Sequence, residues 1–348
     1  MNGWGMRNEY RSWLEEQGIR YETKSRSDSL FVEDGMPSEF HHTKWCVDRA
    51  IEFIDRHAGG GAPWMYSLNL FDPHSPFDPP KEFLQPYLNK IDDIPLPDFE
   101  ERELEGKMHY QREVHAKDIG RYEATYSSLS QDDHRLIRAA YWAMCDLLDK
   151  ELGRLLESLS RHAIEEDTIV VFMSDHGEML GDHGLYLKGP FLYEGAIRVP
   201  LIVSWPKKIR PGCYGELVEL VDIAPSLFDM VGLKIPCDMD GRSFVDLISE
   251  SQERYAPKKS VYSEYRNSGD WPGDEKPLLS MLRTDRYKAI VDHSTDRGEL
   301  YDLKEDPSEI LNRWEDPAYA SMKSELVEKI AERYSNETPT EVPRIAPW

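Results

Sequence analysis

An aspartate and a histidine stand side by side at Asp175 and His176, directly after the apolar run at residues 168–173. The run has the length and the β-branched content of a strand that is buried on both faces. Ligands of open parallel sheets bind just beyond the carboxyl ends of the strands, so a carboxylate and an imidazole at this end are well placed to hold a metal ion. Gly177 lets the backbone turn sharply here. An Asp-His-Gly triplet by itself is usually only a turn, so the neighbouring residues must support the functional interpretation.

Lys188 follows twelve residues after His176, and its ammonium group is a compact charge that suits an anion. His183 lies on the same stretch, in Gly-Asp-His-Gly, and is a candidate for substrate contact, with loop packing as the plainer alternative. His74 lies in a proline-rich segment after a second apolar run, residues 64–71, which is predicted to be a buried strand. The prolines leave this loop few conformations, so a histidine on it can be pre-organised to contact a ligand, with an ordinary surface-loop histidine as the plainer alternative.

The order of these features over about forty residues resembles the sulfatase family of the alkaline phosphatase superfamily. The sequence runs through Asp-His-Gly-Glu, Gly-Asp-His-Gly, the lysine, Tyr-Glu-Gly and Arg-Val-Pro to a second apolar run at residues 199–205. The proline-rich segment around His74 resembles a second signature of the family, and residues 299–314 resemble its C-terminal subdomain. The resemblance implies metal-dependent hydrolysis of sulfate esters.

The resemblance also implies roles for individual residues. Asp175 and His176 are expected to bind the metal, and His74 and Lys188 to act on the substrate, with His183 as a further substrate contact. The implied cofactor is a divalent metal ion, and the resemblance to the family implies calcium. Many sulfatases have asparagine where His176 stands, and an imidazole leaves manganese or another transition metal open.

Part of the family pattern is absent. Sulfatases use a Cys or Ser in a C/S-x-P-x-R motif, oxidised to formylglycine, as the nucleophile, and none of the four cysteines lies in such a motif. Ser204 begins a segment that resembles this motif weakly, with lysine in place of arginine. It stands at the end of the second apolar run, where the family also has a strand end, so we reject it as the nucleophile. The acidic pair that supplies the other metal ligands is also absent. We therefore expect that an N-terminal portion of the family pattern is missing from this chain.

Two alternatives to a sulfatase remain open. Histidine at position 176 also resembles the phosphonate monoester and phosphodiester hydrolases of the superfamily, which would use the same ligands. From another class, a non-catalytic sulfatase remnant would bind an anion or a partner chain and turn nothing over.

Composition limits the partners. The 348 residues carry a net charge of −23, which argues against a nucleic-acid binder and means that an anion site must be locally positive. No apolar run approaches the roughly 18 residues of a membrane span, and the first residues show no signal peptide. The expected partner is a small anionic ester, not nucleic acid or membrane. A homo-oligomer stays open, and the compartment stays unassigned, with the cytoplasm favoured.

The predicted fold class is α/β: a mostly parallel sheet flanked by helices, like alkaline phosphatase, over residues 1–250, and a small α+β subdomain over residues 260–348. Periodicity predicts helices at residues 9–17, 38–55, 133–159 and 317–334, and antiparallel strands at residues 261–265, 278–283, 287–291 and 299–302. Residues 82–133 are expected to form an excursion with short helices. Asp222 is expected to cap a helix or to accept buried hydrogen bonds, and the first sixty residues are expected to carry little chemistry.

Overall fold

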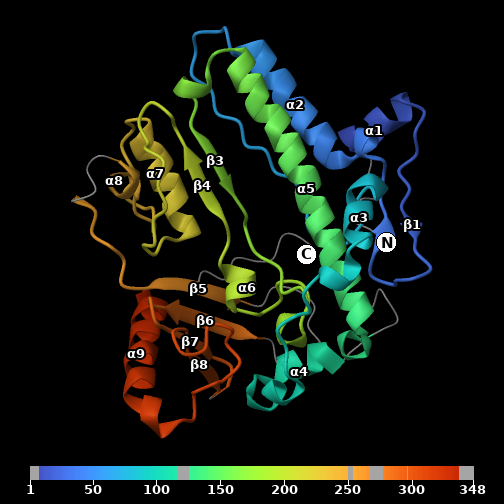
Figure 1. Ribbon diagram of the computed structural model, residues 1–348. Helices are drawn as coiled ribbons and strands as arrows, with labels where there is room; N and C mark the ends of the chain where they lie inside the picture. Colours follow the sequence, from blue (N-terminus) through green and yellow to red (C-terminus); the bar gives the residue numbers. More distant parts are fainter. Residues whose placement is uncertain (1–7, 117–124, 250–253, 267–276, 296, 337–348) are drawn as a thin grey trace. The chain divides into compact units, whose positions relative to one another are not determined.

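The structure is a computed structural model that describes residues 8–116, 125–249, 254–266, 277–295 and 297–336 (Figure 1). The chain divides into two compact units. The first unit comprises Met1–Pro97 and Asp118–Val170, and the second comprises Asp98–Lys117 and Val171–Trp348. Each unit is described by itself. The boundary predicted near residues 250–260 stays a prediction.

The first unit is built around the long helix α5 (Gln131–Arg161). It begins with a capping box, in which the side chains of Ser130 and Asp133 each accept the other's backbone amide. Its buried face, which includes Ile137 and Met144, packs against α2 (His42–His57) and α3 (Lys81–Leu88). The helices predicted at residues 38–55 and 133–159 are thereby confirmed, with ends shifted by a few residues.

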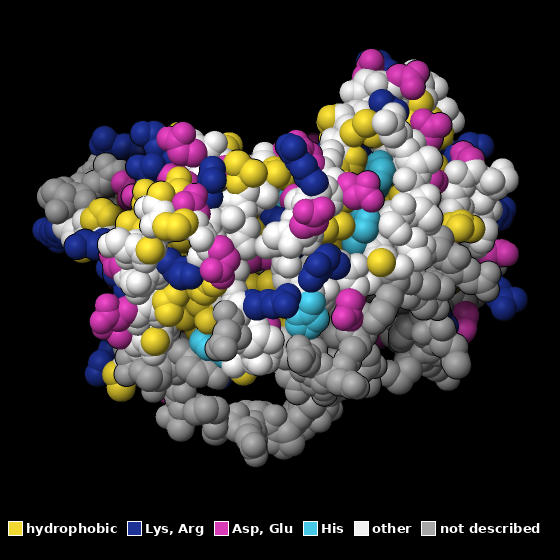
Figure 2. Space-filling model, turned by 90° about the horizontal axis from the view of Figure 1, so that it is seen from below, with side chains coloured by type: hydrophobic (Ala, Val, Ile, Leu, Met, Phe, Trp, Pro, Cys, Tyr) yellow, Lys and Arg dark blue, Asp and Glu magenta, His cyan; other side chains and the backbone are white. Residues whose placement is uncertain are grey.

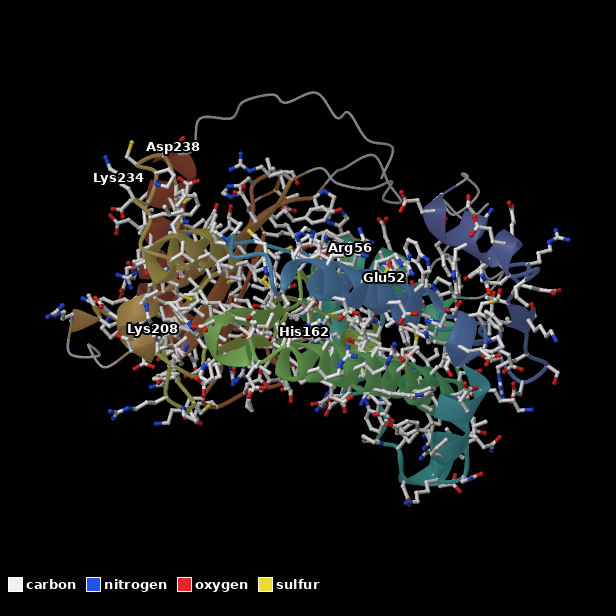
Figure 3. The ribbon with its side chains drawn as sticks, turned by 90° about the horizontal axis from the view of Figure 1, so that it is seen from above. Glu52, Arg56, His162, Lys208, Lys234 and Asp238 are labelled. Atoms are coloured by element: carbon white, nitrogen blue, oxygen red, sulfur yellow. The ribbon has the colours of Figure 1, made fainter. Side chains whose placement is uncertain are left out.

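Figure 3 shows where α2 and α5 run together. Glu52 and Arg56 project from α2 beside the C-terminal end of α5, which His162 marks. His162 Nε2 lies 2.7 Å from Asp55 Oδ1 on α2, so an ion pair joins the two helices there when the histidine is protonated. The same unit holds α1 (Glu9–Glu16), which packs on Met36, and the short antiparallel pair β1 (Lys24–Ser25) and β2 (Glu33–Asp34).

The second unit contains a four-stranded antiparallel sheet in the order β5-β6-β7-β8. Its strands are β5 (Val261–Arg266), β6 (Leu278–Arg283), β7 (Tyr287–Asp292) and β8 (Gly298–Asp302). Helix α9 (Ala320–Asn336) covers one face, with Leu326 and Ile330 buried against Leu282 and Leu300 (Figure 1). All four predicted strands and the predicted terminal helix are confirmed, because each carries a clear local pattern.

This unit also contains a two-stranded sheet of β3 (Val170–Met173) and β4 (Leu201–Ser204), which lie side by side in Figure 1, and further helices. They are α4 (His109–Ala116), α6 (Glu194–Ile197), α7 (Ile223–Met230) and α8 (Val245–Ile248). Asp222 precedes α7, is 1% exposed, and accepts the Arg242 amide at 2.9 Å and the Lys258 ammonium at 2.6 Å. The interpretation of Asp222 as a buried hydrogen-bonding carboxylate is confirmed.

Two expectations about the central sheet are not met by the described residues. Residues 64–71 form no strand, and Met65 and Tyr66 within them are 78% and 39% exposed. The described residues form two two-stranded sheets and one four-stranded antiparallel sheet, so the mostly parallel sheet is not found among them. An apolar run shows that a segment can be buried in a sheet, but a strand also needs a neighbour whose amides and carbonyls pair with its own.

Among the described residues, no helix is both long enough and apolar enough to cross a bilayer. On the face shown in Figure 2, lysine and arginine side chains are interspersed with acidic ones.

Candidate active site

The backbone after β3 fixes the orientation of His176. Ser174 Oγ donates to the His176 carbonyl at 2.7 Å, and the His176 amide donates to Asp175 Oδ1 at 3.1 Å. His176 Nδ1 lies 2.8 Å from the Gly177 carbonyl oxygen. Because a carbonyl oxygen only accepts hydrogen bonds, Nδ1 carries the proton, and the neutral ring keeps its lone pair on Nε2. This Nε2 atom lies 3.9 Å from Asp175 Oδ1, so an oxygen donor and a nitrogen donor neighbour each other at the strand end.

A close approach of two glycines holds this turn in place. The Gly177 amide donates to the Ala196 carbonyl at 2.7 Å, and the Glu178 amide donates to the Gly195 carbonyl at 3.1 Å. A Cβ atom on Gly177 would lie 2.0 Å from the Gly195 carbonyl oxygen, which no side chain tolerates. Glycine at 177 is therefore needed for the contact between this turn and α6, beyond its freedom to turn.

Lys188 returns to the strand end because the intervening loop folds back on itself. The Met179 amide donates to the Leu187 carbonyl at 3.0 Å, and the Glu178 carboxylate accepts the amides of both Leu180 and Leu187. Leu180 and Leu187 adopt positive φ angles of 48° and 66°. Positive φ angles are unfavourable for leucine. The loop therefore depends on the Glu178 carboxylate, which binds the amides of both strained residues.

Charges in the loop act on one another. Burial raises the pKa of Glu178 to about 7, while the amides of Leu180 and Leu187 and the charge of Lys188 oppose that rise. Burial lowers the pKa of Lys188, and the charges of Glu178 and Asp175 partly offset this. Lys188 therefore lies within electrostatic range of Asp175.

His183 is buried among residues of the second unit. Its Nδ1 lies 2.8 Å from Glu103 Oε2, its ring stacks on Tyr193 at 4.1 Å, and its amide donates to the Asp98 carbonyl at 3.0 Å. Only 5% of its side chain is exposed. These contacts support the loop-packing alternative, and a contact of His183 with substrate stays a prediction.

His74 lies in the first unit, on the loop after residues 64–71. Its Nδ1 is 2.6 Å from the Ser75 carbonyl oxygen, and its ring packs on Phe71 with 4.8 Å between centroids. Nδ1 is therefore the protonated nitrogen, and His74 can give a proton from Nε2 only as an imidazolium. The predicted meeting of His74 with Asp175 involves both units and stays a prediction.

A metal ion would find suitable donors at Asp175 and His176 but too few of them. Protein metal sites use three or more protein ligands in most structural and catalytic cases. In the part of the chain that the structure describes, no third His, Cys, Asp or Glu donor groups with these two. The donor types fit a divalent ion, whereas the number of donors does not complete its site.

A different trio of possible ligands was missed by sequence reasoning. His41, His42 and Asp72 each offer a donor atom, and these atoms lie within 4.8 Å of one another. The expectation that the first sixty residues carry little chemistry did not take this group into account, and it stays a prediction. The available signal was a pair of adjacent histidines at the start of a predicted helix, together with an aspartate at the end of an apolar run.

Comparison with known proteins decides the family. The Sulfatase family model matches residues 2–233. The chain belongs to the sulfatase family. A second model, the C-terminal part of N-sulphoglucosamine sulphohydrolase, matches residues 181–336 of this sulfatase-family chain. An arylsulfatase of Clostridium perfringens is 31% identical over 287 residues, which cover 80% of this chain and 54% of that protein. The chain thus spans about half the length of this relative.

Solved structures show that the fold is the alkaline phosphatase-like fold of sulfatases. The phosphonate monoester hydrolase of Agrobacterium radiobacter superposes with a TM-score of 0.77 at 23% identity, over 94% of this chain and 69% of that chain. A structure described as a complex with its substrate D-glucosamine-2-N,6-O-disulfate superposes with a TM-score of 0.70 at 22% identity, over 94% of this chain and 78% of that one. At these identities the likeness concerns the fold alone.

Proposed function

We propose that this chain hydrolyses sulfate esters, with Lys188 and His74 acting on the sulfate group and Asp175 and His176 as two ligands of a divalent metal ion. The observation that supports the proposal is the loop that folds back on itself after β3 and brings Lys188 within electrostatic range of Asp175. Membership of the sulfatase family supports the reaction class.

The reaction breaks the S–O bond of the ester, passes the sulfuryl group to the oxygen of water and leaves a proton on the departing alcohol. Negative charge remains on the sulfuryl oxygens and develops on the leaving oxygen, so fixed positive charge and a proton donor lower the barrier. Lys188 suits a non-bridging sulfate oxygen, because its ammonium is a point charge with rotatable donors. The imidazolium form of His74 would protonate the leaving oxygen.

The metal ion contributes positive charge beside the sulfuryl oxygens when it is bound. His176 suits this role because the Gly177 carbonyl already holds the Nδ1 proton and leaves Nε2 as the donor atom. Calcium is the metal that the family resemblance implies, whereas an imidazole ligand suits manganese or another transition metal better. Among the described residues, Asp175 and His176 are the two ligands that we propose for this metal ion.

A second candidate is a phosphonate monoester or phosphodiester hydrolase. The nitrogen ligand at His176 favours it, because phosphonate hydrolases of the superfamily resemble this chain at that position. A sulfate monoester and a phosphonate monoester each carry one negative charge, so the charge of Lys188 does not separate them. The third candidate, a non-catalytic remnant, would use Lys188 only to bind an anion.

Steady-state kinetics of the purified chain tests the proposal. 4-Nitrophenyl sulfate and 4-nitrophenyl phenylphosphonate are assayed in Ca²⁺, in Mn²⁺ and after chelation. We expect turnover of the sulfate ester, with a loss of roughly 100-fold or more in kcat/KM for Lys188→Ala. Lys208→Ala, which removes a lysine that lies over Trp205, is the matched control and should leave kcat/KM unchanged.

Each outcome separates the candidates. A preference for the phosphonate ester would favour the second candidate over the first. The absence of turnover of either ester by correctly folded protein in every metal would overturn both hydrolase proposals. Calorimetric binding of sulfate that is lost in Lys188→Ala would then support the remnant.

A further inference from the structure

We propose that His41, His42 and Asp72 form a metal site of their own in the first unit, and that it takes a transition metal ion of the zinc type. His42 Nε2 lies 3.3 Å from Asp72 Oδ1, and His41 Nδ1 lies 3.6 Å from Asp72 Oδ2. A tetrahedral ion about 2.0–2.1 Å from each donor places donor atoms about 3.4 Å apart. The two observed spacings, one to each carboxylate oxygen, lie close to that edge and exceed the length of an ordinary charge-assisted hydrogen bond, and the three donor atoms all lie within 4.8 Å of one another.

The carboxylate of Asp72 is the second observation that points to a cation. Its side chain is completely buried. Thr43 Oγ1 donates to Oδ2 at 2.6 Å, but Oδ1 has no hydrogen-bond partner. A buried carboxylate oxygen without a hydrogen bond is costly, because desolvation is not repaid. A metal ion between this oxygen and the two imidazoles would remove that cost.

The histidines are held by the start of α2. His41 is the N-cap residue and His42 the first residue of the helix, and their rings lie 4.2 Å apart. Thr43 Oγ1 lies 3.2 Å from His42 Nδ1, which leaves Nε2 on the side of Asp72. His41 Nδ1 accepts a long hydrogen bond from the Thr43 amide at 3.3 Å, and an ion at this atom would replace that hydrogen bond.

The chemistry of the donors selects the ion. Two imidazoles and one carboxylate suit Zn²⁺, Co²⁺ or Mn²⁺, whereas Ca²⁺ and Mg²⁺ prefer oxygen ligands throughout. A cavity of about 10 Å³ adjoins His42 and is lined by Tyr10, Tyr21 and Asp78 among others. That volume accommodates about one water molecule, which would complete four-coordination.

The consequence for the molecule is a clamp between two segments. Asp72 precedes His74 by two residues, and the histidines belong to α2. The ion would therefore fix the loop that carries His74 to the start of a helix. This site shares no residue with Asp175 and His176, and the inference stands whether or not the chain proves to be a hydrolase.

Metal binding by the whole chain tests the site. Isothermal titration with Zn²⁺ should show one ion that survives in the Asp175→Asn/His176→Ala double variant. Asp72→Asn and His42→Ala should each weaken binding by about 100-fold or more, above the 10–100-fold typical of residues that merely support a ligand. Ca²⁺ at the same concentration should not compete.

A gain-of-signal variant keeps the test decisive if Asp72→Asn unfolds the chain. His42→Cys supplies a thiolate, so the Co²⁺ complex should acquire an intense sulfur-to-cobalt charge-transfer band that wild type lacks. The proposal is overturned if folded wild type binds no Zn²⁺. It is also overturned if binding persists in both ligand variants, if it disappears in the Asp175→Asn/His176→Ala variant, or if His42→Cys binds Co²⁺ without the new band.

Discussion

Replacing Lys288 with methionine should destabilise the second unit strongly and loosen the segment that supports the Asp175–His176 turn. Lys288 belongs to β7 and its side chain is completely buried. Its Nζ lies 2.8 Å from Glu194 Oε1 in α6 and 2.6 Å from Glu309 Oε1. Since α6 also binds the turn after β3, the lysine links the antiparallel sheet to the candidate active site.

The size of the effect follows from what the substitution leaves behind. Removing one partner of a buried ion pair costs about 3–5 kcal/mol, because the other charge stays buried without compensation. Glu194 would keep Arg283 at 3.2 Å, but Glu309 Oε1 is buried and accepts no hydrogen bond, so it loses its cation. We therefore expect a loss of about 3 kcal/mol at pH 7, the lower end of that range.

The loss should depend on pH in a defined direction. Burial raises the pKa of Glu194, but Lys288 and Arg283 outweigh burial and bring it below its usual value of 4.5. In wild type this carboxylate therefore contributes stability that is present above pH 4.5 and is lost as the pH falls through the lowered pKa. In Lys288→Met the pKa of Glu194 rises, so the difference between wild type and variant should shrink in acid, where a neutral carboxyl needs no cation.

Urea unfolding measured by hydrogen exchange of peptides from β7 and α6 reports this unit directly. Lys329→Met is the matched control, because Lys329 Nζ also lies 2.6 Å from a carboxylate, Glu325, but its side chain is 43% exposed. An exposed pair is worth about 0–1 kcal/mol. The reasoning fails if the two substitutions cost the same at pH 7, or if the cost of Lys288→Met grows as the pH is lowered.

Three further predictions concern the turn, the loop and the metal. Gly177→Ala should cost about 1–3 kcal/mol in urea unfolding, as overpacking does, whereas Gly215→Ala, whose Cβ would meet nothing within 4 Å, should be nearly neutral; equal effects would contradict the close approach. Glu178→Ala removes the acceptor of two amides and should cost about 2–4 kcal/mol, while Glu178→Gln keeps an acceptor and should cost less; the opposite order would refute the role of this carboxylate. Chelation of protein loaded with Zn²⁺ should lower its melting temperature, and the Asp72→Asn variant should show no such shift; an unchanged melting temperature in loaded wild type would count against the clamp.

The sequence predicted best what depends on neighbours along the chain. The apolar face and capping box of α5 are both local, and so are the short apolar strands of the C-terminal sheet. The return of Lys188 to the strand end also depends on a short stretch, since Glu178 and the amides that it binds lie within ten residues of one another. Residues 64–71 were wrongly predicted to be a strand. Their apolar character is visible in the sequence, but a strand also needs a neighbouring strand from elsewhere in the chain, which the sequence does not reveal.

The candidate site shows the same limit. Sequence alone could not choose between substrate contact and loop packing for His183, because its packing partner Glu103 lies 80 residues away and no pattern in the loop reveals it. His41 and His42 looked like an ordinary helix start, because Asp72 lies 30 residues further on and only the fold brings them together. Glu309, the second partner of Lys288, was likewise invisible in the sequence. Contacts across long separations therefore account for most of what sequence reasoning missed.

The carboxylate of Glu178 holds the loop in a strained backbone conformation. Its two amide partners, Leu180 and Leu187, are bulky residues that would leave their left-handed conformations if released. Relaxation there would uncoil the hairpin and carry the Lys188 ammonium away from the strand end. Glycine or asparagine at position 180 or 187 would adopt the positive φ angle with less strain and would leave the hydrogen bond to Glu178 in place. These two positions are therefore natural places for evolution or engineering to adjust how firmly the loop is closed.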